Sequence, residues 1–171
     1  MNINIFFTII IAGLFVIFFL FKPLNIKEQN FTDMPLLELA KFKLIELDNK
    51  GLLTITEGSK GARYSDKYTV TDLDYTDNTN EYLANITSKN ALYKGDLIKL
   101  DGDVIYSRED GFAFQTQKAN YNTKTKIAES KTRYVSHMGE HRATGSSIKY
   151  DNVRGIVKSK NIVAKYKLKE R

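Results

Sequence analysis

Apolar residues follow two different patterns along the chain. Residues 3–21 contain no charged side chain, and Asn4 and Thr8 are the only polar members of that run. From residue 36 onward, short stretches of alternating apolar and polar residues are separated by clusters of turn-forming residues. A long apolar run predicts a membrane helix, whereas period-two alternation predicts half-buried β-strands. The chain therefore divides into two parts of different character.

The apolar run over residues 3–21 predicts a membrane anchor. At about 1.5 Å per residue, a helix of this length matches the ~30 Å hydrocarbon core of a bilayer. A cleaved signal peptide would need basic residues before the run and small residues near its end. No Lys or Arg precedes the run, and bulky residues fill positions 18–21. We expect a transmembrane anchor over residues 1–22 and a juxtamembrane linker over residues 23–35. The flanking charges leave the orientation open.

Residues 36–171 are expected to form one all-β domain of short antiparallel strands. The stretch 36–47 also fits a helical turn, and we interpret it as a strand. The pattern predicts further strands over 52–56, 112–116 and 162–168, and turns at 48–51, 77–80 and 108–111.

Glycines suggest two further breaks. Gly58 and Gly61 are expected to interrupt the strand that begins at residue 52. Asp101-Gly102 lies between the apolar stretches 97–100 and 104–106, and this arrangement predicts a hairpin turn.

The second half of the chain contains a weak internal repeat with a period of 29 residues, which places Tyr150 on Tyr121 and Ile156 on Ile127. A repeated hairpin predicts a sheet that grows by the stacking of similar units. Chance spacing of tyrosine, a common strand residue, is the alternative.

The expected interior consists mainly of aliphatic residues and tyrosine. The chain has no Trp, and only four of its ten Phe follow residue 30. An antiparallel sheet with such a lining forms either a filled core or a groove of lipid size, and the sequence does not distinguish the two.

Positive charge is concentrated at the C-terminal end. Residues 142–171 carry nine basic and two acidic side chains, against 17 basic and 18 acidic ones in residues 1–141. A basic end suits nucleic acid, an acidic protein edge or an anionic lipid headgroup. Nucleic acid is not expected, because the lysines lack interleaved stacking aromatics. Protection of an outer strand against aggregation is the structural alternative.

No feature of the sequence predicts an enzyme. The absence of Cys excludes disulfides, thiolate zinc sites and a thiol nucleophile. His137-Met138-Gly139-Glu140-His141 fits H-x-x-E-H, but that zinc motif requires a helix, which Gly139 and the flanking strands disfavour. We expect no metal and no cofactor. A small anchored hydrolase that uses the two histidines is the weakest alternative.

The order of these features resembles the LptC family of lipopolysaccharide-export proteins. An N-terminal anchor and a linker precede a β-domain, and a Gly-Asp-Val motif lies at residues 102–104. It is followed by further positions that are similar to the wider family, which includes the soluble bridge protein LptA. These are residues 114–116, 119–121, 127–128 and 159–161 with Ala164. Residues 30–85 match no such motif.

The resemblance implies a transmembrane helix followed by a twisted, open antiparallel β-jellyroll with an apolar groove. It implies a single-pass inner-membrane protein whose C-terminal domain lies in the periplasm. The permease and ATPase subunits of an ABC transporter would extract lipopolysaccharide, and the anchor would pack on the permease. The groove would receive the acyl chains, and the C-terminal edge would pass the lipid to an LptA-like periplasmic bridge protein.

The resemblance also suggests site residues. The strand over 161–168 is the expected docking edge for the bridge protein, through Asn161, Val163, Lys165 and Lys167. Core packing is the alternative role for the groove residues, and the corresponding alternative function is a membrane-anchored assembly partner with a filled core and no lipid cargo. The groove candidates are the apolar members of one strand parity, namely Ile98, Leu100, Val104, Tyr106, Phe112, Phe114, Tyr121, Ile148, Tyr150, Ile162, Ala164 and Tyr166.

Overall fold

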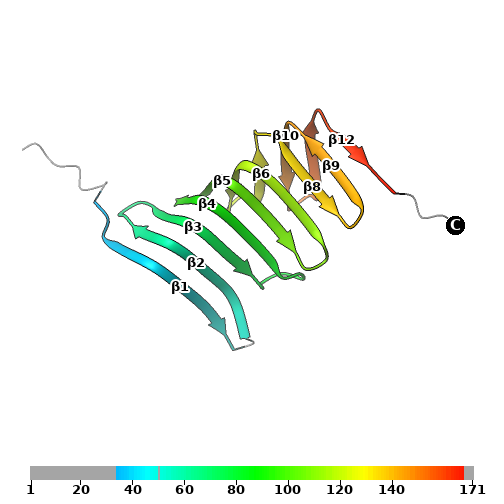
Figure 1. The fold of residues 1–171 in the computed structure, drawn as a ribbon. Helices are drawn as coiled ribbons and strands as arrows, with labels where there is room; N and C mark the ends of the chain where they lie inside the picture. The colour runs from blue at the N-terminus through cyan, green and yellow to red at the C-terminus, as the bar shows by residue number, and fades with distance from the viewer. Residues whose placement is uncertain (1–33, 50, 168–171) are drawn as a thin grey trace, which may run out of the picture. The chain divides into compact units, whose positions relative to one another are not determined.

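The computed structural model describes residues 34–49 and 51–167, and these residues form a single antiparallel sheet (Figure 1). The predicted all-β class is confirmed. The strands are β1 (Leu37–Asp48), β2 (Gly51–Arg63), β3 (Tyr68–Asp77), β4 (Ala84–Lys94), β5 (Leu97–Arg108), β6 (Phe112–Asn122), β7 (Ile127–Ser130), β8 (Tyr134–Met138), β9 (His141–Gly145), β10 (Ser147–Asp151), β11 (Ile156–Lys160) and β12 (Val163–Lys165).

The predicted anchor over residues 1–22 lies outside the described residues, as does the linker up to residue 33. Within the described part of the chain, no helix is long and apolar enough to cross a membrane.

β1 to β6 form a continuous meander in which each strand pairs with the next (Figure 1). The stretch 36–47 is confirmed as a strand, since it coincides with β1. The turns predicted at 48–51, 77–80 and 108–111 also fall between strands, because β1, β3 and β5 end at Asp48, Asp77 and Arg108. Alternation and turn composition therefore determine most of the meander.

A line of backbone irregularities crosses the middle of the meander. Lys41 in β1, Asp72 in β3 and Asp103 in β5 have φ values of 48°, 51° and 48°. This left-handed region costs a residue other than glycine about 1 kcal/mol or more. Ser59 Oγ on β2 supports one of these positions by donating a hydrogen bond to the Asp72 carboxylate at 2.6 Å. Along this line the strands bend. The side-chain parity that faces inward changes there in β1 and β3, whereas β5 keeps its parity because the irregularity at Gly102 and Asp103 adds one residue.

The expected hairpin at Asp101-Gly102 is wrong. β5 continues through these residues, and Gly102 and Asp103, with φ values of 83° and 48°, form a bulge within it. The Asp103 carboxylate is held by Lys89 Nζ at 2.8 Å and accepts a hydrogen bond from Gln117 at 3.0 Å. Asp-Gly favours positive φ in a bulge as well as in a hairpin, so the dipeptide alone does not distinguish them.

The expected break at Gly58 and Gly61 is also wrong, because both residues lie within β2. The ring of Phe42 on β1 covers them. A Cβ atom on Gly61 would lie 2.7 Å from this ring, and one on Gly58 would lie 2.9 Å from it. These glycines allow a ring to approach the backbone closely and do not form a turn.

The sheet divides into two branches at β6. Residues 112–116 of β6 pair with β8, whereas residues 120–122 pair with β7. One branch continues as β7–β10–β11 and the other as β8–β9–β12. Within the described part of the chain, β1, β11 and β12 each pair with one neighbour and are therefore edge strands.

The predicted 29-residue repeat is confirmed in the hairpins β6–β7 and β10–β11. The carboxamide of Asn122 and the carboxylate of Asp151 each accept hydrogen bonds from the backbone N–H groups two and three residues later. Each residue then pairs with the first residue of the following strand, Ile127 or Ile156. The two turns therefore have the same length and the same side-chain cap.

Thr116 is the centre of a buried hydroxyl network at the fork, the point on β6 where the two branches of the sheet separate. Its Oγ1 lies 2.8 Å from the hydroxyls of both Ser130 and Thr132, and it donates a hydrogen bond to the Arg133 carbonyl at 3.0 Å. Thr116 and Ser130 are only 6% and 2% exposed. The network ties β6 to the segment that connects β7 with β8.

We expect Thr116→Val to destabilise the domain. The substitution keeps the shape of the side chain but deprives buried hydroxyls of a partner, which costs about 1–3 kcal/mol in the free energy of unfolding. Urea unfolding of the full-length protein in detergent, followed by circular dichroism, measures this. Thr125→Val, at an exposed turn position, is the control and should change the free energy by less than about 0.5 kcal/mol. Equal effects of the two substitutions would show that the network does not stabilise the fork.

Candidate functional site

Strand register identifies the inner face of the bent sheet. Val104 pairs with Thr116, which pairs with Tyr134, so the three side chains point to the same side. All three are buried. The Tyr134 hydroxyl lies 2.8 Å from Ser159 Oγ on β11, and Ser159 belongs to the same row of register partners as the buried Ser130. The two branches therefore face each other across the inner side of the sheet.

The register places ten of the twelve predicted groove residues on this inner face. The other two, Ile162 and Tyr166, flank β12 and share the parity of Ala164, which pairs with Ala143 in the inner row. The Tyr166 ring also lies 5.5 Å from the ring of His141. The ten are Ile98, Leu100, Val104, Tyr106, Phe112, Phe114, Tyr121, Ile148, Tyr150 and Ala164. Their contact with lipid stays a prediction.

Sequence reasoning missed the part of the inner face formed by β1 to β4, because this region matches no family motif. Apolar and polar residues alternate there, but the inward-facing positions change between odd and even residue numbers where each of these strands bends. The apolar face therefore does not appear as one continuous pattern in the sequence. The missed residues are Leu37, Leu39, Phe42 and Leu44 on β1, Tyr68, Val70, Leu73 and Tyr75 on β3, and Ile86, Ala91 and Tyr93 on β4.

The inner face is apolar but largely uncovered. In the described part of the chain, Ala84, Val104 and Tyr134 are the only hydrophobic residues that are buried. Inner-face residues farther from the fork remain exposed, with values of 51% for Leu37 and 38% for Tyr150. A filled core would bury most such side chains. The inner face is therefore an open apolar surface, which we call the groove.

The groove is most tightly packed near the fork. The Phe114 and Tyr134 rings stack with centroids 5.5 Å apart, and Tyr106 meets Phe112 edge-on at 6.1 Å. A Cβ atom on Gly145 would lie 2.6 Å from the Tyr134 ring, so only glycine allows this approach. Aromatic rings thus form a rigid apolar wall at this end.

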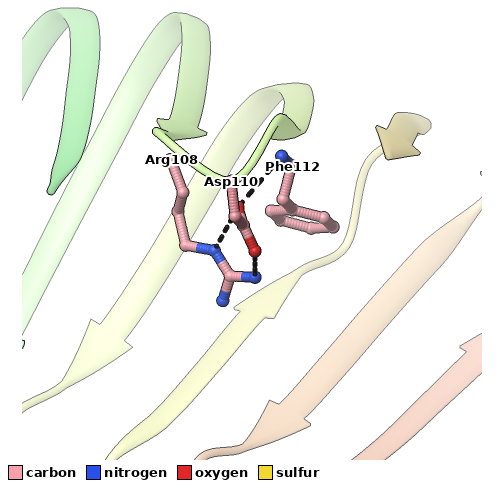
Figure 2. A network of polar contacts seen from close by, with 3 residues as sticks. All are labelled: Arg108, Asp110 and Phe112. Atoms are coloured by element: carbon pink, nitrogen blue, oxygen red, sulfur yellow. Dashed lines mark hydrogen bonds and ion pairs between the residues drawn. The ribbon is translucent and has the colours of Figure 1, made fainter. Parts of the chain in front are cut away.

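A charged network lies at the end of this wall, in the β5–β6 turn. Figure 2 shows that the Arg108 guanidinium makes two contacts with the Asp110 carboxylate, which also accepts a hydrogen bond from the Phe112 N–H at 3.1 Å. The guanidinium lies 5.2 Å from the centroid of the Tyr82 ring and 5.1 Å from that of Phe112. The hydrogen bond from Arg108 lowers the pKa of Asp110 below its ordinary value, and the Phe112 N–H adds to this effect.

The predicted docking strand is shorter than expected. β12 spans Val163–Lys165, not residues 161–168, of which Leu168 lies outside the described residues. Asn161 precedes the strand with a φ of 52° and donates a hydrogen bond to Ser146 Oγ at 3.0 Å. Lys167 follows it and forms an ion pair with Glu140 at 2.9 Å. Only Val163 and Lys165 of the four candidates are therefore edge-strand residues.

The two histidines lie on neighbouring strands of the β8–β9 hairpin. Met138 pairs with His141, and His137 pairs with Arg142, so the histidine side chains point to opposite faces. Among residues 34–49 and 51–167, no group of three or more metal-ligating side chains is placed to hold an ion.

Comparison with known proteins identifies the family. The family profile described as "Lipopolysaccharide-assembly, LptC-related" matches residues 7–165. The chain belongs to the LptC-related family. This LptC-related chain is similar in structure to LptH, described as the LptA homologous periplasmic component of the conserved lipopolysaccharide transport device from Pseudomonas aeruginosa. The TM-score is 0.52 at 14% identity, over 81% of this chain and 99% of that chain. No curated protein sequence matches.

These comparisons confirm the family resemblance and the open, LptA-like antiparallel fold of the LptC-related chain. At 14% identity, the likeness to LptH shows the fold alone.

We expect Arg108→Gln to raise the pKa of Asp110 toward the ordinary value of 3.8. A lowered carboxyl pKa stabilises the folded state above the unfolded value, and this stabilisation is lost as the pH falls through the folded value. The difference in the free energy of unfolding between wild type and R108Q should therefore be present at neutral pH and shrink below pH 3.8. Urea unfolding across this range measures it. Lys118→Gln, which removes one partner of the more exposed ion pair with Asp101, is the control. If the difference in the free energy of unfolding between wild type and R108Q did not depend on pH, the proposed effect of Arg108 on the pKa of Asp110 would be contradicted.

Proposed function

We propose that this protein is the inner-membrane-anchored, lipopolysaccharide-binding subunit of the lipopolysaccharide export system. It accepts the lipid from the ABC transporter and passes it along the apolar groove to a periplasmic bridge protein. Membership of the LptC-related family supports a role in lipopolysaccharide transport. The observation that carries the finer proposal is the continuous apolar inner face that the fold leaves uncovered.

The groove has the continuity that a lipid carrier needs. Acyl chains that cross water cost about 0.8 kcal/mol for each exposed CH₂ group, so an interrupted path would impose a large barrier. A row of register partners crosses six strands without a charged side chain. This row consists of Leu39, Gly61, Val70, Ala91, Leu100 and Ala119.

Transfer to the next protein uses the C-terminal end of the sheet. β12 pairs only with β9 within the described residues, so its outer edge offers unpaired backbone groups. Addition of a strand from the bridge protein would extend the sheet and align the two grooves, with backbone hydrogen bonds as the docking interaction. The subunit carries out no chemistry, because the ATPase subunit supplies the energy.

Photocrosslinking in cells tests the lipid cargo. A photoreactive phenylalanine analogue at Phe114 faces the groove, whereas one at Ala113 on the same strand faces outward, since Ala113 pairs with His137. We expect a lipopolysaccharide adduct at Phe114 that is at least about tenfold stronger than at Ala113. Absence of adducts at Phe114 and at several other inner positions would favour an assembly partner without lipid cargo.

Charge reversal tests the docking edge. We expect Lys165→Glu with Lys167→Glu to weaken capture of the bridge protein about three- to tenfold, because exposed charge pairs contribute only modestly to binding. A pull-down from detergent-solubilised membranes measures this. Lys149→Glu with Lys158→Glu, a register pair on the outward face of β10 and β11, is the control of equal charge. Unchanged capture by the first variant would place the docking site elsewhere.

A further inference from the structure

The two rims of the groove carry opposite charge. Antiparallel strands place successive turns at opposite ends of the sheet (Figure 1). The turns β1–β2, β3–β4, β5–β6 and β8–β9 form one rim, and the turns β2–β3, β4–β5, β6–β7 and β10–β11 form the other. We call them the acidic rim and the basic rim. Counted from the last residue of one strand to the first residue of the next, the described residues of the acidic rim carry six acidic side chains and one basic side chain, and those of the basic rim carry three acidic and six basic ones.

The members of each rim are spread over all of its turns. Among the described residues, the acidic rim contains Asp48, Asp77, Glu81, Glu109, Asp110 and Glu140, with Arg108 as its basic member. The basic rim contains Arg63, Lys67, Lys94, Lys124, Lys126 and Arg154, with Asp66, Asp96 and Asp151 as its acidic members.

Three cations of the basic rim gather on two adjacent turns. Lys124 and Lys126 lie in the β6–β7 turn and Arg154 in the β10–β11 turn, and the Asn152 N–H donates a hydrogen bond to the Lys126 carbonyl at 3.1 Å. The nearest acidic residue in these turns, Asp151, uses its Oδ1 to accept two backbone N–H groups and approaches Arg154 only to 3.9 Å. This group therefore keeps a positive charge that is available to an anion.

A row of tyrosines lies immediately inside the basic rim. Tyr68 pairs with Tyr93, and the same row of register partners continues through Tyr121 to Tyr150. Tyr68, Tyr93 and Tyr150 are 45%, 42% and 38% exposed, and the rings of the first two stack at 6.1 Å. Tyrosine places an apolar ring next to hydrocarbon and a hydroxyl toward water, so such a row suits the boundary between acyl chains and a polar headgroup.

The corresponding row inside the acidic rim has the opposite character. It contains Glu46, whose carboxylate accepts a hydrogen bond from Thr54 at 2.7 Å, and Asp77, which pairs with Thr54. The row continues to Arg108, whose charge is paired with the Asp110 carboxylate. Carboxylates at the edge of an apolar floor repel phosphate groups.

We propose that the basic rim holds the phosphate-bearing polar end of the bound lipid, so that the lipid lies in the groove in one orientation. Its acyl chains rest on the groove floor, its polar end lies over the tyrosine row, and its phosphates contact Lys124, Lys126 and Arg154. This inference rests on the proposed lipid cargo and adds the direction in which that cargo is bound.

Binding of two forms of the lipid to the full-length protein in detergent tests the orientation. The probes are purified lipopolysaccharide with its lipid A phosphates and the same lipid after dephosphorylation. The test variant combines Lys124→Glu, Lys126→Glu and Arg154→Glu. The control variant combines Lys149→Glu, Lys158→Glu and Lys160→Glu, which lie on outward positions of β10 and β11 and change the net charge equally.

We expect the test variant to bind the phosphorylated lipid about tenfold more weakly than wild type and the dephosphorylated lipid as wild type does. The control variant should differ from wild type by less than about twofold. Equal weakening by the two variants, or the same loss of affinity for both lipids, would contradict the proposed orientation but not the proposed lipid cargo. Failure of wild type to bind either lipid would contradict the proposed function itself.

Discussion

The bend across β1, β3 and β5 is the constraint on which the groove depends. In β1 and β3 the inward residues of the two strand halves have opposite parity, so a flat strand would place them on opposite faces of the sheet. The positive φ values at Lys41 and Asp72 accompany the change of parity that brings both halves inward. In β5 the bulge at Gly102 and Asp103 adds one residue, so Leu100 and Val104 both face inward with the same parity. The carboxylates of Asp72 and Asp103 are held by neighbouring strands, which offsets the cost of the left-handed conformation.

Stability and function make opposite demands on this fold. A domain usually gains stability by burying its apolar side chains, yet here most of the inner face stays uncovered. The described residues compensate through long strands with continuous backbone pairing and through the hydroxyl network at the fork. The network joins the branches without filling the space between them. This arrangement suits the proposed carrier, because a bound lipid would supply the missing apolar contacts.

Local patterns in the sequence predicted much of the fold and half of the candidate site. Turn composition located the ends of β1, β3 and β5, because these features depend on neighbours along the chain. The stretch 36–47 fitted both a helical turn and a strand, and its interpretation as a strand was confirmed. Bulge and turn have the same sequence signature, so Asp101-Gly102 was misinterpreted as a turn. Gly58 and Gly61 were misinterpreted because their role depends on Phe42, a residue of another strand. The fork at β6 follows from a choice of pairing partners, which no local pattern encodes.

The distribution of charge in the fold could not be predicted from local patterns either. Counted along the chain, cations concentrate in the last 30 residues. In the fold those residues separate, since Lys149 lies on the outer face, Lys165 on an edge strand and Arg154 on the basic rim. The difference between the rims comes instead from the alternation of turns between the two ends of the sheet. Every second turn along the chain lies on the same rim, and successive turns lie on opposite rims. In a count along the sequence, the acidic turns and the basic turns therefore cancel, although the fold places them on separate rims.

The central claim is that the inner face is an open groove that lipid covers. The chain contains no Cys, so a single introduced thiol reports on one position. Ala119, whose register partner is Leu100, faces the groove, and Ala113 on the same strand faces outward. The most direct measurement is the alkylation rate of Ala119→Cys and Ala113→Cys in the full-length protein, with and without lipopolysaccharide. We predict that both thiols react in the free protein and that lipopolysaccharide protects only the one at residue 119. A thiol at residue 119 that is unreactive without lipid, or equal protection at both positions, would contradict the groove.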